Sequence, residues 1–209
     1  MITDRNHQAS KQLKPALILS AISLILMIIQ SGAGVLTSGM YATDSVWSRA
    51  SWHGNDMVTL CIFSPMLLGA LVLVIRGSVR GRVLWLGLQA LVTYNFIYYA
   101  LAVVYNQYFL LYVAVLGVSL YSFLFGISSL DFDSFALYKP GPVRRVTVCA
   151  IQFLFAGTLA LVWIGQAILF ITTGQIRQEG LGLISTVDLV IVVPPMILSG
   201  VWLLRGESR

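Results

Sequence analysis

The chain has 209 residues, of which 58% are hydrophobic and only 10% are charged, against roughly 25% charged residues in an ordinary soluble domain. Its mean hydropathy is +0.87. A soluble protein of this size needs more charge to cover its surface, so the composition argues against a soluble enzyme, a disordered chain and a disulfide-rich secreted module. It is typical of an integral membrane protein.

Six apolar stretches are each long enough to cross a bilayer as a helix, which takes about 20 residues. None contains lysine or arginine, and none alternates as a membrane β-barrel strand does. We therefore predict an all-α fold, a polytopic bundle of six transmembrane helices. The bundle forms one domain at 15–205, and a polar segment at 1–14 precedes it and a tail at 206–209 follows it. The predicted spans are 16–36, 57–75, 83–104, 108–130, 146–172 and 181–204.

Basic residues alternate between successive connections. Eleven of the 13 lysines and arginines fall in the N-terminal segment, the second and fourth loops and the tail, and only Arg49 and Arg177 fall in the other loops. By the positive-inside rule both termini are cytoplasmic, and we expect a prokaryotic inner or plasma membrane. The net charge of +5 then faces anionic lipid headgroups, so we expect the lipid bilayer, and no nucleic acid, as a partner.

The first two spans flank a predicted outer loop at 37–56. Gln30 lies about 9 Å below the outer end of the first helix, and Asp56, preceded by His53, stands at the outer mouth of the second. The blander interpretation is that Asp56 caps the second helix and that His53 is an interfacial histidine. Pro65, in the middle of the second span, breaks its helical hydrogen bonding.

The third and fourth spans are rich in tyrosine, with seven of the nine tyrosines between Tyr94 and Tyr121. One interpretation is an aromatic belt at the outer interface. The other is that some hydroxyls line a pocket, because Asn95 lies about 15 Å below the outer end of its helix, which is too deep for a belt. Tyr98, on the face that it shares with Tyr94, is then a candidate ligand-binding residue.

The last two spans add a glutamine and a carboxylate. Gln166 lies about 9 Å below the outer end of the fifth helix, and Asp188 lies about 9–10 Å below that of the sixth. An ionisable side chain inside a bilayer is expensive and is a functional hypothesis by default, although a structural hydrogen bond would also explain Asp188. Two prolines, Pro194 and Pro195, interrupt this helix, as Pro65 does the second.

These polar residues predict a polar cavity that opens to the extracytoplasmic side, framed by the two interrupted helices. The candidate ligand-binding residues are His53, Asp56, Asn95, Tyr98, Gln166 and Asp188. No motif indicates a catalytic residue, and one histidine with two scattered carboxylates is a weak metal signal. We therefore assign no catalytic residue, metal or cofactor, and whether the chain is an enzyme stays open.

The stretch at 52–130 resembles a group of uncharacterised bacterial and archaeal polytopic membrane proteins. The resemblance rests on the runs at 52–56, 76–82 and 94–121 and on Asp188 followed by two prolines. The architecture is also similar to the substrate-binding subunits of energy-coupling-factor vitamin transporters, which have six helices, cytoplasmic termini and an outward-facing pocket. Their first helix carries small residues at four-residue spacing, and the first helix here departs from this pattern, since it offers a poor version of it in Ala16 and Ser20.

Three functions follow as hypotheses. The first is binding or transport of a small molecule or cation in the outward-facing pocket. The second is an accessory subunit of a larger membrane complex, which needs other membrane subunits as partners but no pocket. The third is an intramembrane enzyme that uses Asp56 and Asp188, which requires polar groups within about 3 Å of a common reacting position.

Overall fold

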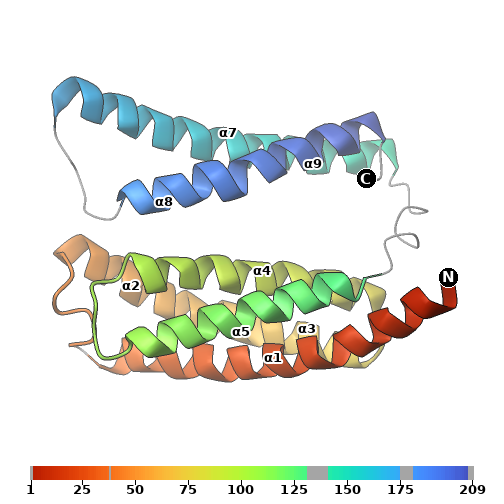
Figure 1. The fold of residues 1–209 in the computed structure, drawn as a ribbon. Helices are drawn as coiled ribbons and strands as arrows, with labels where there is room; N and C mark the ends of the chain where they lie inside the picture. The colour runs from red at the N-terminus through yellow and green to blue at the C-terminus, as the bar shows by residue number, and fades with distance from the viewer. Residues whose placement is uncertain (1, 38, 131–140, 175–180, 207–209) are drawn as a thin grey trace. The chain divides into compact units, whose positions relative to one another are not determined.

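The computed structural model describes residues 2–37, 39–130, 141–174 and 181–206, and every regular element in these ranges is a helix (Figure 1). Three predictions fall partly outside the described residues: the tail at 206–209 and the loops that contain Lys139 and Arg177. The helices are α1 (Ile2–Leu36), α2 (Val46–Val58), η1 (Thr59–Phe63), α3 (Ser64–Ile75), α4 (Val79–Leu101), α5 (Phe109–Ser128), α7 (Pro142–Thr173), α8 (Leu181–Val187), η2 (Asp188–Val192) and α9 (Val193–Arg205).

Six helices in the described ranges are long and apolar enough to cross a membrane, which confirms the predicted all-α fold and its six candidate spans. They cover Gln12–Leu36, Val46–Ile75, Val79–Leu101, Phe109–Ser128, Val143–Thr173 and Gly182–Arg205.

The second helix begins well before the predicted start at residue 57. Ser45 forms its N-cap, because its hydroxyl oxygen accepts a hydrogen bond from the backbone N–H of Ser48 at 3.3 Å. The interpretation of Asp56 as a cap is therefore wrong, since a serine already satisfies the first turn. Asp56 lies about 15 Å further along the same helix.

The two helices with prolines in mid-span each include one π-helical turn just before the proline. The turn η1 ends at Phe63, ahead of Pro65, and η2 ends at Val192, ahead of Pro194. Proline lacks the N–H that an α-helix needs, and the wider turn accommodates that loss. The predicted interruption of these two helices is confirmed, and η2 begins at Asp188 itself.

The described helices group into two compact units, Met1–Leu130 (unit 1) and Asp131–Arg209 (unit 2), a division that we did not expect from the sequence. In unit 1, α1 packs against α5 and against the helix formed by α2, η1 and α3, while α4 packs against α3 and α5 (Figure 1). In unit 2, α7 packs along α9 and η2.

The core of unit 1 includes many polar side chains among its apolar ones. Gln89 of α4 is buried and accepts a hydrogen bond from the Ser20 hydroxyl at 2.9 Å, and its side-chain NH₂ donates to the Ser23 hydroxyl at 3.1 Å. The indole N–H of Trp85 donates to the Ser20 oxygen at 2.8 Å. These bonds join α1 to α4 in an apolar bundle, where unpaired polar groups would be costly.

Candidate functional site

Asp56 is the most completely buried carboxylate among the described residues, with 0% of its surface exposed. One oxygen, Oδ1, accepts hydrogen bonds from the Tyr99 hydroxyl at 2.6 Å and from Nε2 of Gln30 at 3.2 Å. The other, Oδ2, accepts from the Tyr41 hydroxyl at 2.8 Å. We call Gln30, Tyr41, Asp56 and Tyr99 the carboxylate cage, and every donor in it is uncharged.

Four separate segments build the cage. Gln30 comes from α1, Asp56 from α2 and Tyr99 from α4, and Tyr41 lies in the connection between α1 and α2. Nε2 of Gln30 also donates to the Tyr41 oxygen at 3.2 Å, so the donors are linked to each other as well as to the carboxylate. The cage therefore depends on the packing of the whole bundle.

Gly34 makes room for the carboxylate on the α1 side. A Cβ at this position would collide with Oδ2 of Asp56 and would lie 2.5 Å from its Cγ. A larger residue at position 34 would force Asp56 away from its donors. The Asp56 side chain is short and is hydrogen-bonded at both oxygens, so it cannot move without breaking these bonds.

Tyr41 lies outside the candidate membrane spans. Burial raises the pKa of its phenol well above the ordinary value, and the nearby Tyr99 and Asp56 raise this pKa further. The hydroxyl therefore stays protonated at every physiological pH and remains a permanent donor to Asp56.

The hydrogen bonding continues from the cage to Asn55 and Asn95. Nδ2 of Asn55 donates to the Tyr99 oxygen at 3.2 Å and to Oδ1 of Asn95 at 2.7 Å. Nδ2 of Asn95 is buried and has no hydrogen-bond partner among the described residues. A chain of contacts thus runs from a carboxylate to a buried amide donor that is available to an acceptor.

Residues 39–45, which we call the strap, cover this end of the bundle. Oδ1 of Asp44 accepts hydrogen bonds from the Trp52 indole N–H and from the backbone N–H of Val104, both at 3.3 Å. The Trp52 ring in turn packs on Tyr99, with ring centroids 5.3 Å apart. The second oxygen of Asp44 is buried and has no hydrogen-bond partner in the described part of the chain.

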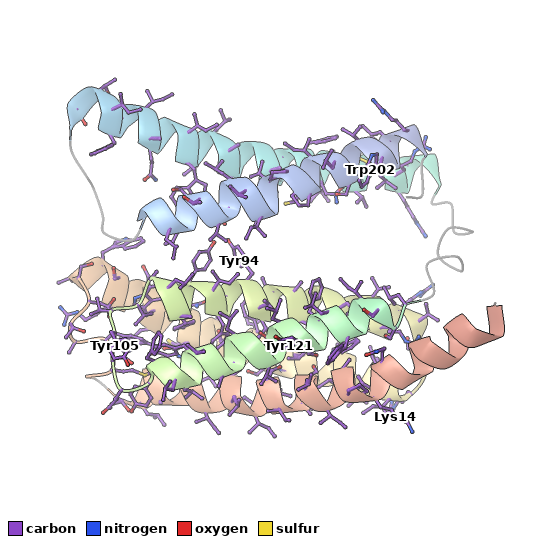
Figure 2. All side chains as sticks on the ribbon, in the orientation of Figure 1. Lys14, Tyr94, Tyr105, Tyr121 and Trp202 are labelled. Atoms are coloured by element: carbon purple, nitrogen blue, oxygen red, sulfur yellow. The ribbon has the colours of Figure 1, made fainter. Side chains whose placement is uncertain are left out.

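Three of the predicted ligand-binding residues come together in unit 1. Asp56 forms the cage, Asn95 is joined to it through Asn55, and the ring of His53 packs edge-on against Tyr41 at a centroid distance of 5.4 Å. Tyr98, also on α4, packs edge-on against Tyr94 with ring centroids 4.8 Å apart, and Tyr94 is labelled in Figure 2.

Asp188 and Gln166 belong to unit 2. Asp188 is buried, and its Oδ2 accepts a hydrogen bond from the Trp163 indole N–H at 2.7 Å. Gln166, on α7, is half-buried. Each predicted membrane carboxylate therefore has a donor within its own unit.

The predicted ligand-binding residues do not include Tyr41, Tyr99 or Gly34. Tyr99 lies four residues after Asn95 and shares its helix face, and this shared face is the signal in the sequence that points to it. Nothing in the sequence distinguishes Tyr41 from the other residues of a loop, and the role of Gly34 depends on contact between two helices.

The chemistry of the cage is that of carboxylate and hydroxyl oxygens with uncharged hydrogen-bond donors. No group of three or more His, Cys, Asp and Glu side chains that could hold a metal ion occurs among the described residues. The cage and its extension do offer a carboxylate with uncharged donors and, at Asn95, an unused amide.

No family model matches this chain, and no curated protein and no solved structure matches it either.

Proposed function

We propose that this chain is a multi-pass protein of a prokaryotic inner or plasma membrane that binds a small molecule or ion at the carboxylate cage and carries it across the bilayer. Both termini lie in the cytoplasm, and the cage faces the extracytoplasmic side. The six apolar helices support the membrane location.

The carboxylate of Asp56 is the observation on which the proposal rests. It lies at 0% exposure inside an apolar bundle, and its donors are two tyrosines and a glutamine rather than a lysine or arginine. Taking a charge out of water without a counter-charge is expensive, and ionisable groups kept within membrane helices mark ion and substrate pathways. A ligand that supplies the missing positive charge or a proton would remove that cost.

Unused polar groups next to the cage support the same function. Nδ2 of Asn95 and Oδ2 of Asp44 are buried without a hydrogen-bond partner among the described residues, and each such group normally has an explanation such as an unseen water or ligand. One is a donor and the other an acceptor. Together with Asp56 they suit a small ligand that bears both kinds of group.

Charge distribution supports the orientation within unit 1. Consecutive helices of this bundle run antiparallel (Figure 1), so Arg76 after α3 and Arg80 and Arg82 at the start of α4 lie at the end where α1 starts. Figure 2 shows Lys14 near that end and Tyr105 at the opposite one. The strap lies at the same end of the bundle as Tyr105. This end carries fewer basic residues than the opposite end, as expected for the extracytoplasmic side.

Native mass spectrometry of the full chain in lipid nanodiscs tests the proposal. Wild-type protein should retain a small mass that is lost when Asp56→Asn removes the negative charge, and Tyr99→Phe, which removes one donor, should weaken retention. Tyr121→Phe is the matched control, since Tyr121 lies on α5 and is exposed.

The same spectra separate the alternatives. Identical small masses on wild type and Asp56→Asn would contradict a ligand at the cage. A co-purifying polypeptide, with no small mass that depends on Asp56, would favour an accessory subunit of a membrane complex.

A further inference from the structure

Thr59, the first residue of the π-turn η1, has a buried hydroxyl without a hydrogen-bond partner among the described residues. Threonine hydroxyls inside helices commonly donate to a carbonyl one turn earlier. Thr93 and Thr158 do so here, with distances of 2.9 and 2.8 Å to the carbonyls of Gln89 and Leu154. Thr59 is 0% exposed, so water around the protein cannot satisfy it either. A buried hydroxyl in this position indicates an unseen partner.

Asp56 lies one turn before Thr59, and residues three apart on a helix are neighbours. Its carboxylate accepts hydrogen bonds from the three cage donors and lies close to the Ser31 hydroxyl, and none of these groups is positively charged. An unpaired hydroxyl and a carboxylate without a counter-charge therefore lie on adjacent turns of one helix.

The π-turn η1 leaves one backbone carbonyl without its helical donor. The backbone N–H of Ser64 bonds the Thr59 carbonyl, and the Ser64 hydroxyl donates to that carbonyl at 2.8 Å. Pro65 has no N–H, so one carbonyl of the preceding turn loses its helical donor. Turns of this kind are frequent at functional sites, and carbonyls freed in interrupted membrane helices can coordinate ions.

We propose that Asp56 and Thr59 hold a monovalent alkali cation next to the carboxylate cage, with a carbonyl of η1 as a further ligand. This deepens the proposed function, since it names the class of ion that the cage binds. The charges favour a single positive charge, because one carboxylate and one such cation are neutral together, whereas a divalent ion would leave a net charge in the apolar bundle. Carboxylate, hydroxyl and carbonyl oxygens are all hard ligands, which suit alkali cations.

Thermal unfolding of the full chain in nanodiscs tests the site, with sodium chloride or potassium chloride compared with choline chloride at equal ionic strength. A ligand that binds only the folded protein stabilises it by mass action, so an alkali salt at about 100 times its Kd should raise the apparent Tm by roughly 5–10 °C. Thr59→Val should abolish this response and Thr59→Ser, which keeps the hydroxyl, should preserve it. Asp56→Asn should abolish it as well.

Thr59→Val also separates a cation site from a structural role. Without alkali cations this variant should be at least as stable as wild type, because it removes an unpaired buried hydroxyl. Three results would overturn the proposal. The apparent Tm of wild type could rise as much with choline as with the alkali cations, or it could rise only with magnesium or calcium. The apparent Tm of Thr59→Val could also rise with the alkali cations as much as that of wild type does. If the alkali response is absent while wild type still retains a small mass that depends on Asp56, the cation site fails and the proposed function stands. If both are absent, both fail.

Discussion

Asp56 and Gly34 are complementary at the scale of single residues. Gly34→Ala should displace the Asp56 carboxylate and break its hydrogen bonds, since the new Cβ would lie 2.5 Å from Cγ. Overpacking of this kind costs about 1–3 kcal/mol. The free energy of unfolding of the full chain, measured by titrating mixed micelles with a denaturing detergent, checks this prediction.

Gly32 provides a matched control for that measurement. It lies on the same helix, and a Cβ there meets nothing within 4 Å. Gly32→Ala should leave stability unchanged or raise it by about 0.5–1 kcal/mol, the ordinary gain of alanine over glycine within a helix. Equal effects of the two substitutions would contradict the close approach of Gly34 to Asp56.

Asp188 depends on Trp163 in unit 2. Trp163→Phe removes an indole N–H that lies 2.7 Å from Oδ2 of Asp188, and a buried acceptor that loses a donor costs about 1–3 kcal/mol. The same detergent titration should show this loss. Trp202→Phe, at a partly exposed ring on α9, should have a much smaller effect, and similar losses in the two variants would show that the bond is unimportant.

The candidate site was predictable from the sequence only in part. A carboxylate or an amide within an apolar stretch is conspicuous, so Asn95 and Asp188 could be found from their residue type and depth, and Asp56 from its position at the end of such a stretch. Their partners could not be identified in this way. Tyr41 contacts the carboxylate because of the way the loop between α1 and α2 folds. Gly34 is important because α1 and α2 lie close together at this position. Neither feature produces a pattern in the sequence.

The helices were predicted from the sequence more completely than the residues of the site. Hydrophobic length located six spans, and the prolines located the two interrupted helices, because both effects act within one segment. The start of α2 was missed, since 46–56 is polar and resembles a loop by composition. Its helix begins at the Ser45 cap and brings Asp56 into the bundle.

The Ser20–Gln89 contact shows how one side chain joins helices. Gln89→Met keeps the length of the side chain and removes its hydrogen bonds to Ser20 and Ser23. Hydrogen bonds between membrane helices contribute about 0.6–2 kcal/mol each, so the free energy of unfolding should fall by about 1–3 kcal/mol. Thr158→Val, which breaks only a bond within α7, should change it little, and a Gln89→Met variant as stable as wild type would contradict this role.

The predicted orientation is a property of the whole molecule and can be tested by labelling. In a chain with Cys61→Ala and Cys149→Ala, Tyr105→Cys should react with a membrane-impermeant maleimide on intact bacterial cells. Arg80→Cys should react only after the cells are permeabilised, because basic loops stay in the cytoplasm. Both positions are exposed, so the reverse pattern would contradict the proposed orientation of the cage.

The central claim is that unit 1 binds a small ligand at the carboxylate cage. An experimental density map of the wild-type chain in nanodiscs, at a resolution that shows ordered ions and water, tests it most directly. The account predicts density that is not protein within hydrogen-bond or coordination distance of Oδ2 of Asp56. A cage closed by Gln30, Tyr41 and Tyr99 alone, with no such density beside Asp56, would contradict it.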